Sequence, residues 1–316
     1  MNISADVAVD AERKKPDFII IGAMKCATTT LYDQLNQQSG IFMPALKEPN
    51  FFSDDEQYSR GVQWYEEIFS GARAGDLVGE ASTHYTKFPT YPETIQRIRK
   101  LLPGVRLIYV MRHPIDRLVS QYIHEWSCGN IRVGLDEALK RHPELIAYSR
   151  YSYQLQPYLE AFGADNVLPV FFERLKSEPQ KELDRVAKFI GYPESVCWHN
   201  EIAPKNISKE RIRRFPFYEF ILQNKFMSNL RRTLVPKVVR NLVKKTLQMN
   251  ERPRLSDDSL IRLTEIFDRE LMSIGSALGV DLNVENYVEM VTSRQLEWSC
   301  QSYSPELKRT NKAVLM

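Results

Sequence analysis

A short apolar run near the start of the chain, DFIIIG at residues 17–22, constrains the fold more than any other stretch. The run is continuous and rich in isoleucine, as expected of a strand buried on both faces of a parallel sheet. A loop follows it, and residues 28–37 then have helical character. The first part of the chain therefore predicts a strand, a loop and a helix, in that order.

The alternation of apolar runs and helical patterns continues along the chain. Further strands are predicted at residues 75–82, 106–114 and 166–175. Helices are predicted at residues 92–102, 153–162 and 179–192. Gly191 suits the C-terminal cap of the last helix. This order predicts the α/β class, with a three-layer open parallel sheet covered by helices on both faces. After Pro193 helical patterns dominate as far as residue 279, which predicts a helical C-terminal part.

Length and composition predict one main domain. A chain of 316 residues with 43% hydrophobic content can bury one large core. We expect residues 1–16 to be a flexible leader, residues 17–298 to form the domain and residues 299–316 to be a loosely ordered tail. The four cysteines have neither zinc-site spacing nor the density of a disulfide scaffold, which favours a reducing compartment. The apolar run at the start is too short for a signal anchor or membrane span, so we expect a soluble, cytoplasmic protein.

The charge balance excludes few partners, but the charged residues are unevenly distributed along the chain. The formal net charge of +3, from 43 basic and 40 acidic residues, does not by itself require a nucleic acid or a membrane as partner. Residues 220–250, however, contain lysines and arginines and no acidic residue. We interpret this stretch as a packed helix pair with a solvated basic face. A platform for an acidic polysaccharide and a peripheral contact with anionic lipid are the alternatives.

The loop after the first predicted strand has the composition of a phosphate-binding site. It combines a cation, small side chains that let backbone amides approach an anion, and hydroxyl donors: Lys25, Cys26, Ala27, Thr28, Thr29 and Thr30. In an open α/β sheet such a loop lies where a helix N-terminus favours an anion. It departs from the triphosphatase pattern G-x-x-x-x-G-K-[ST], because Lys25 follows Gly22 by three residues and no second glycine precedes it. An ordinary strand-to-helix turn with a solvated lysine is the alternative.

A second strand end carries an arginine where Mg²⁺-dependent kinases and triphosphatases generally hold the metal with an aspartate. The run RLIYVMRHPIDRLVSQY ends its strand at Arg112, and Pro114 is suited to begin the next helix. Arg112 can bond a phosphate bidentately, and Ser120 can donate from the same side. A pairing of Arg112 with a carboxylate at the sheet edge is the alternative. The two loops together predict a ligand with separated phosphates and no required metal.

These motifs together resemble those of sulfotransferases that use 3′-phosphoadenosine 5′-phosphosulfate, in the bacterial and heparan-sulfate-type branch of that family. The resemblance implies a fold similar to that of the P-loop nucleoside triphosphatases. It rests on KCATTTL, RHPIDRLVSQYIH and KEPNFF, with weaker support from GEASTHY, YSYQL and VFFERLKSEP. By resemblance, Lys25 and the loop as far as Thr30 bind the 5′-phosphosulfate, and Arg112 and Ser120 bind the 3′-phosphate.

Two features depart from the family pattern. The glycine-rich basic segment that contacts the 3′-phosphate in cytosolic animal members is absent, and Lys205 and Lys209 are the residues expected to replace it. Members that act on heparan often have a lysine where GEASTHY has Ala81, so a cation on the acceptor side is missing. We expect His84, on the same segment, to substitute for that cation.

The resemblance also implies roles in sulfuryl transfer. Glu48, within LKEPNFF, is similar to the general base of the family, and the proline and aromatic residues after it are expected to desolvate its carboxylate and raise its pKa. Lys25 would neutralise the bridging oxygen, Lys47 would contact the nucleotide or the sulfuryl group, and His124 would bind sulfate or act as an alternative base. The alternatives are a surface Glu48 paired with Lys47, and histidines that are structural or merely exposed.

The sequence thus predicts an enzyme, a sulfotransferase that moves a sulfuryl group by in-line displacement to a hydroxyl, or less favourably an amine, on a glycan. We expect neither a metal nor a nucleic acid partner. A P-loop nucleotide kinase and a non-catalytic binder of polyanions or membranes are the rival functions. The sequence leaves open the oligomeric state and the acceptor, since a saccharide, a lipid, a carrier-bound acyl chain and a small alcohol or phenol all suit the motifs.

Overall fold

The structure of the protein is a computed structural model that describes residues 15–202 and 251–299. Apart from residues 15, 16 and 299, the predicted leader and tail lie outside these described residues. So do Lys205, Lys209 and the basic stretch 220–250, and the roles expected of them stay predictions.

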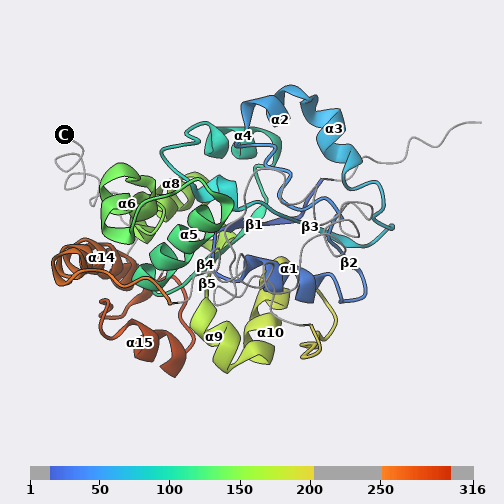
Figure 1. Ribbon diagram of the computed structural model, residues 1–316. Helices are drawn as coiled ribbons and strands as arrows, with labels where there is room; N and C mark the ends of the chain where they lie inside the picture. The colour runs from blue at the N-terminus through green and yellow to red at the C-terminus, as the bar shows by residue number, and fades with distance from the viewer. Residues whose placement is uncertain (1–14, 203–250, 300–316) are drawn as a thin grey trace, which may run out of the picture.

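Five parallel strands form a sheet at the centre of the described chain, in the order β2-β3-β1-β4-β5 (Figure 1). Their bounds are β1 (Phe18–Gly22), β2 (Ile41–Phe42), β3 (Leu77–Ala81), β4 (Arg106–Met111) and β5 (Val167–Phe171). All four neighbouring pairs are parallel, and each of the four predicted strands is present. The strand β2 has no counterpart in the prediction, because two residues are too few to show a periodic pattern.

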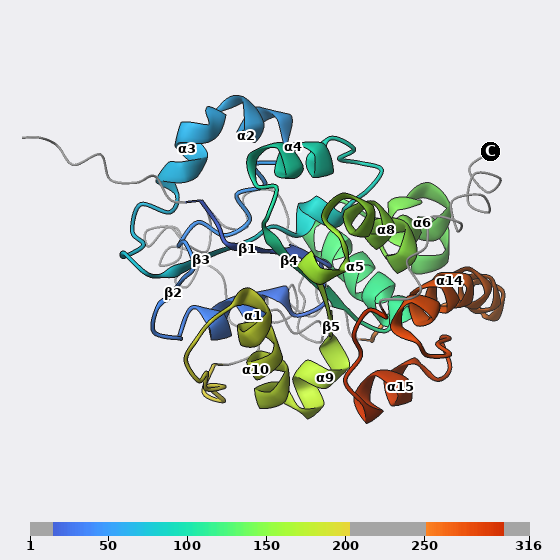
Figure 2. The ribbon, with the colours of Figure 1, turned by 180° about the vertical axis from the view of Figure 1, so that it is seen from behind.

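Helices cover both faces of the sheet, as Figures 1 and 2 show from opposite sides. One face carries α1 (Thr28–Leu35), α9 (Phe172–Ser177) and α10 (Pro179–Ile190). The other carries α4 (Thr94–Leu101) and α8 (Tyr151–Phe162), with α2 (Asp55–Ser59) and α3 (Gly61–Glu67) next to α4. Short 3₁₀ turns follow β3 and precede β5, namely η1 (Thr83–Thr86) and η2 (Ala164–Asn166). The predicted three-layer α/β architecture is confirmed.

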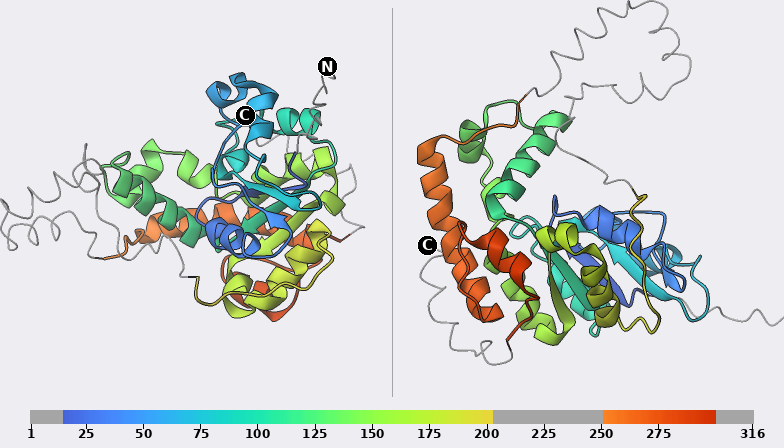
Figure 3. Two further views of the ribbon diagram at one scale, coloured as in Figure 1. Left: turned by 90° about the vertical axis from the view of Figure 1, so that its right-hand side faces the viewer. Right: turned by 90° about the horizontal axis from the view of Figure 1, so that it is seen from below.

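A second hydrophobic core lies beside the sheet and is built from helices alone. It joins α5 (Pro114–Cys128), the long helix after β4, to the next helices along the chain, α6 (Leu135–Arg141) and α7 (Glu144–Ala147), and to α14 (Asp257–Leu278) of the C-terminal part. Figure 3 shows α14 running along α5 at the side of the sheet, with α15 (Tyr287–Ser293) returning beneath it. Leu118 and Ile123 of α5 pack in this core with Phe267 of α14. The helical C-terminal part is therefore confirmed, and it anchors the helix that leaves β4.

The helix α14 has well-defined ends and a polar link to the rest of the domain. Ser256 caps its N-terminus by accepting from the amide of Ser259, and Gly279 ends it in the left-handed conformation. Glu270, near the middle of the helix, accepts from Arg150 Nε at 2.9 Å and from the amide of Tyr153 at 3.0 Å. Within the ranges 15–202 and 251–299, no helix has both the length and the apolar character needed to span a bilayer.

The prediction for β5 is wrong at its C-terminal end. The sequence pattern continues the strand to residue 175, whereas β5 ends at Phe171 and α9 begins at Phe172. Phe171 pairs with Met111, the last residue of β4. Pro114 starts α5 three residues after Met111, so β5 has no strand to pair with beyond Phe171 and ends there. The length of a buried strand is thus set by its partner as well as by its own apolar residues.

The absence of a side chain at Gly79 lets Phe18 of β1 and Met43 pack closely against β3. A Cβ atom at this position would lie 2.2 Å from Phe18 Cζ and 2.4 Å from Met43 Sδ, which are distances that real Cβ atoms do not adopt. Phe18 is fully buried and Met43 almost so, and neither has open space to move into. The glycine is therefore required by packing in the core.

Replacing Gly79 with alanine is expected to destabilise the protein by roughly 1–3 kcal/mol, because the extra methyl group overpacks a closed core. The free energy of unfolding from urea titration measures the effect. Gly104→Ala is the matched control, because nothing lies within 4 Å of a Cβ built there. Equal stability of the two variants would show that the core around Phe18 can relax.

Candidate active site

The two predicted phosphate loops meet at the carboxyl edge of the sheet. Arg112 follows β4 directly, and its Nη1 donates to the carbonyl oxygen of Lys25 in the β1–α1 loop at 3.4 Å. The amide of Ala23, which opens that loop, donates to the carbonyl of Val110 in β4 at 2.9 Å. Segments almost ninety residues apart in the sequence are thereby joined, as the prediction of a shared ligand requires.

The β1–α1 loop has an unusual backbone. Lys25 (φ 73°) and Ala27 (φ 66°) are both left-handed although neither is glycine, a conformation that costs about 1–3 kcal/mol for each residue. Gly22 admits no side chain, because a Cβ there would lie 2.0 Å from Thr86 Oγ1. Ala27 provides no side-chain cap for α1, so the amide groups of the first turn point outward uncapped by a side chain. A helix N-terminus without a side-chain cap is suited to an anion, and anion binding at this loop stays a prediction.

The side chains of this loop divide between the core and the site. The Cys26 thiol lies in the hydrophobic core, and burial raises its pKa to about 11. Only its backbone is therefore suited to contact a ligand. Thr28 is buried, whereas Lys25, Thr29 and Thr30 are half-buried. Their predicted roles in binding the donor stay predictions.

The backbone of Arg112 is held by a tyrosine from α8. The Arg112 amide donates to Tyr151 Oη at 3.1 Å, and the Tyr151 hydroxyl donates to the Arg112 carbonyl at 2.5 Å. The guanidinium lies over the ring of Phe172, 4.6 Å from its centroid. Its Nε is buried without a hydrogen-bond partner, and no carboxylate forms an ion pair with it in the part of the chain that the structure describes. The alternative in which Arg112 pairs with an edge carboxylate is therefore not supported.

Glu48 lies in a loop bound to the end of β3. Its amide donates to the carbonyl of Ala81 at 3.1 Å, and its carboxylate accepts from the Thr83 amide at 2.7 Å and from Thr83 Oγ1 at 3.1 Å. Burial raises the pKa of Glu48, while the bonds from Thr83 and the nearby charges of Lys87 and Lys47 lower it. A carboxylate held in this way, with a raised pKa, is suited to accept a proton near neutral pH.

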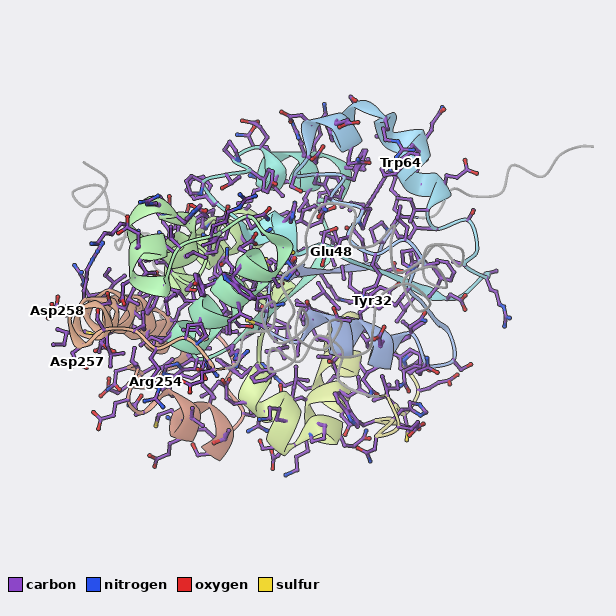
Figure 4. The ribbon with its side chains drawn as sticks, viewed as in Figure 1. Tyr32, Glu48, Trp64, Arg254, Asp257 and Asp258 are labelled. Carbon is purple, nitrogen blue, oxygen red and sulfur yellow. The ribbon has the colours of Figure 1, made fainter. Side chains whose placement is uncertain are left out.

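Lys47, next to Glu48 in the chain, contacts α1. Its Nζ lies 4.2 Å from the ring centroid of Tyr32 and 4.0 Å from Asp33 Oδ1. Figure 4 shows Glu48 and Tyr32 near the centre of the molecule, while Arg254 lies far off beside the start of α14. The described contacts pair Lys47 with Asp33 and the half-buried Glu48 carboxylate with Thr83, which does not favour the alternative of a surface Glu48 paired with Lys47. The contacts place Lys47 between the loop and α1.

A fully buried carboxyl group is connected to the Glu48 loop by hydrogen bonds. Glu80 of β3 accepts hydrogen bonds from the hydroxyls of Tyr65, Tyr85 and Ser82. Ser82 Oγ in turn accepts from the amide of Asn50 at 3.1 Å, two residues beyond Glu48. Burial raises the pKa of Glu80 to about 7, against the opposing effect of these hydrogen bonds. Glu80 thus links the sheet to the loop that carries the candidate base.

The aromatic pair after Glu48 belongs to the core. Phe51 and Phe52 are fully buried, and Phe51 stacks on Tyr65 with the ring centroids 4.5 Å apart and the planes at 12°. They fix the loop from within and form no exposed acceptor platform.

The two candidate histidines differ in their surroundings. His84 stacks on Tyr91, with the ring centroids 5.1 Å apart, and burial together with the charge of Lys87 lowers its pKa to about 4. This lowered pKa does not favour the expectation that His84 replaces a missing cation, and its role on the acceptor side stays a prediction. His124 lies half-buried on α5 with Nε2 4.0 Å from Cys128 Sγ, and its catalytic role stays a prediction. Ser120, on the same helix, is buried, and its role is likewise untested.

Sequence reasoning missed two residues that contribute to this site. Thr83 binds the Glu48 carboxylate, and the charge of Lys87 opposes the rise that burial causes in the pKa of Glu48. Thr83 lies within the motif GEASTHY, two residues after Ala81, and this position was a usable signal. No sequence pattern marks Lys87, which directly follows the 3₁₀ turn η1.

The fold and the paired phosphate-type loops define an α/β protein of the P-loop-like class. A sequence profile described as "Sulfotransferase domain" matches residues 15–274, which is most of the chain. The chain therefore belongs to the sulfotransferase family.

Its relatives include enzymes named for heparan sulfate. The chain is 28% identical over 204 residues to heparan sulfate glucosamine 3-O-sulfotransferase 5 of Homo sapiens, covering 60% of this chain and 58% of that protein. It is 26% identical over 208 residues to bifunctional heparan sulfate N-deacetylase/N-sulfotransferase 1 of Xenopus laevis, covering 60% of this chain and 23% of that protein. Among solved structures, a sulfotransferase from Alicyclobacillus acidocaldarius is similar with 26% identity and a TM-score of 0.51, covering 73% of this chain and 96% of that one.

Replacing Glu80 with glutamine is expected to change how stability depends on pH. The folded pKa of about 7 lies above the value of about 4.3 for an unfolded glutamate, so the folded state retains a proton that the unfolded chain releases. The contribution of Glu80 to stability should therefore fall by about 3 kcal/mol between roughly pH 5 and pH 8, so the stability of the wild type relative to Glu80→Gln should fall by that amount over this range.

Urea unfolding at the two pH values measures the difference. Glu67→Gln, at an exposed position on α3, is the control and should keep the wild-type fall. The same pH dependence in Glu80→Gln and wild type would mean that the buried carboxyl is not protonated in the folded state.

Proposed function

We propose that this chain is a sulfotransferase that transfers a sulfuryl group from 3′-phosphoadenosine 5′-phosphosulfate to a hydroxyl, or less favourably an amine, of a glycan, with Glu48 as the general base. The observation that carries the proposal is the Glu48 carboxylate itself. It is held by Thr83, has a pKa raised by burial, and belongs to a loop that also contacts α1, the helix that begins at the Lys25 loop.

The residues at the sheet edge fit the donor nucleotide. The Nε of Arg112 is buried and has no hydrogen-bond partner among the described residues, as expected of an N–H group that binds an anionic ligand. The N-terminus of α1 lacks a side-chain cap, which suits a second anionic group. Lys25 and Thr28 to Thr30 would hold the 5′-phosphosulfate, and Arg112 with Ser120 the 3′-phosphate. The bound donor supplies the sulfuryl group and a bisphosphate leaving group.

The chain's own residues supply the proton transfer and the charge. Glu48 takes the proton of the acceptor hydroxyl while the acceptor oxygen bonds to sulfur and the bond from sulfur to the 5′-phosphate oxygen breaks. Lys25 and the amides of α1 stabilise the negative charge that develops on that phosphate oxygen. His124 is a second group suited to contact the transferring sulfuryl group.

The glycan acceptor is supported by the relatives. Two of them are named for sulfation of heparan sulfate, one at a 3-hydroxyl and one at nitrogen. The alignments leave much of each relative uncovered, so the acceptor of this chain is inferred from the shared catalytic region alone. A screen of glycan acceptors with radiolabelled donor tests it directly.

Glu48→Gln is expected to lower kcat by about 10²–10⁴-fold, because the amide cannot take the acceptor's proton. Binding of adenosine 3′,5′-bisphosphate, measured by isothermal titration calorimetry, should change little. Glu56→Gln, at an exposed position on α2, is the matched control for turnover. Normal turnover by Glu48→Gln would remove Glu48 from the mechanism.

Arg112→Met is expected to weaken binding of adenosine 3′,5′-bisphosphate by roughly ten- to a hundredfold, since charge-assisted hydrogen bonds to the phosphate are lost. Calorimetry of the full chain without metal measures the affinity. Arg132→Met, which removes an exposed arginine, should leave it unchanged. A wild-type chain that ignores this nucleotide and instead binds ATP with Mg²⁺ would contradict the proposed function and favour a kinase.

A further inference from the structure

The hydroxyl group of Tyr151 takes the place of a neighbouring strand at the end of β4. Arg112 directly follows β4, whose last residue, Met111, pairs with Phe171 at the end of β5. The Arg112 amide donates to Tyr151 Oη at 3.1 Å, and the hydroxyl donates to the Arg112 carbonyl at 2.5 Å. Backbone groups that are removed from water need such partners. One side chain thus satisfies both backbone groups of the residue that is proposed to bind the 3′-phosphate.

Tyr151 lies behind the site and influences it only through Arg112. Its side chain is fully buried, and its ring packs edge-on against Tyr109 with the centroids 6.0 Å apart. A ligand at the sheet edge therefore meets the Arg112 guanidinium and not the tyrosine. That guanidinium lies over the ring of Phe172, and its Nη1 donates to the carbonyl of Lys25 at 3.4 Å. A shift of the Arg112 backbone would move the guanidinium relative to the Lys25 loop.

The position of Tyr151 is itself fixed by a carboxylate from α14. The helix α8 begins at Tyr151, and the residue before it, Arg150, provides no side-chain cap. Glu270 of α14 instead accepts from the Tyr153 amide in the first turn of α8, at 3.0 Å, and from the Ser152 hydroxyl. It also accepts from Arg150 Nε at 2.9 Å. The C-terminal helix thus caps the helix that carries Tyr151.

We propose that Tyr151 is a positioning residue for recognition of the 3′-phosphate: its hydroxyl fixes the backbone of Arg112 so that the guanidinium meets the phosphate, and Glu270 fixes Tyr151. This inference rests on the proposed function, in which Arg112 binds that phosphate. It gives α14, which carries none of the residues proposed to contact the donor, a role in binding it.

The test compares two nucleotides that differ only in the 3′-phosphate, adenosine 3′,5′-bisphosphate and adenosine 5′-monophosphate. Titration of the full chain followed by nuclear magnetic resonance measures both affinities, including weak ones. In Tyr151→Phe the affinity for the bisphosphate should fall about tenfold, because Arg112 loses the hydrogen bonds that hold it. The affinity for the monophosphate should keep its wild-type value. Glu270→Gln should show the same selective loss, and an unchanged bisphosphate affinity in that variant would overturn the part assigned to Glu270.

Tyr158→Phe is the matched control for the loss of a buried hydroxyl. Tyr158 is fully buried on the same helix, and its hydroxyl donates to the backbone carbonyl of Tyr85. Its removal should lower the free energy of unfolding in urea, as Tyr151→Phe does, and leave the ratio of the two affinities unchanged. If Tyr151 served stability alone, Tyr151→Phe would change both affinities by the same factor or neither, and either result would overturn the inference.

A double-mutant cycle determines whether Tyr151 acts through Arg112. In Arg112→Met the guanidinium is gone, so adding Tyr151→Phe should weaken binding of the bisphosphate no further. A second loss of about tenfold in the double variant would mean that the two residues act independently, which contradicts the inference.

The wild type separates this inference from the proposed function. A wild type that binds the bisphosphate no more tightly than the monophosphate would contradict the proposed function, and the inference with it. A wild type that prefers the bisphosphate, together with an equal preference in Tyr151→Phe, would contradict the inference alone.

Discussion

Parallel pairing of β1 with both β3 and β4 is the constraint on which the site depends. Because the three strands run in the same direction, the residues that follow each of them come to one edge of the sheet. The Lys25 loop, the Thr83 turn and Arg112 meet there, although they are far apart in sequence. Gly79 and Gly22 allow the neighbouring segments to pack closely against β3 and β1, because a side chain at either position would collide with one of those segments.

Burial determines the charge of the groups at this edge. It disfavours whichever form of a group is charged, so it raises the pKa of Cys26, Glu48 and Glu80 and lowers that of His84 and Lys87. The result is a site with an inert thiol, a neutral imidazole and a carboxylate whose basicity is raised. Hydrogen bonds from Thr83 limit the rise that burial causes in the pKa of Glu48.

Local patterns were sufficient for most of the fold. The continuous apolar runs of β1, β3, β4 and β5 are visible because parallel strands are covered on both faces. Pro114 and Gly191 mark helix ends for reasons of backbone geometry that hold in any context. The short β2 and the end of β5 were not predictable, since each depends on where a neighbouring strand lies. The helical core that joins α5 to α14 was equally hidden, because its members are distant in sequence.

The sequence by itself determined the kinds of group in the site: a lysine with threonines after one strand, an arginine after another, and a glutamate in KEPNFF. Only the tertiary structure decided which of them are ionised, which are paired and which point into the core. It placed Cys26 in the core and Lys47 in contact with Asp33 of α1. The physical reason is that charge state and pairing depend on desolvation and on distances between residues remote in the chain, and neither is written in any local pattern.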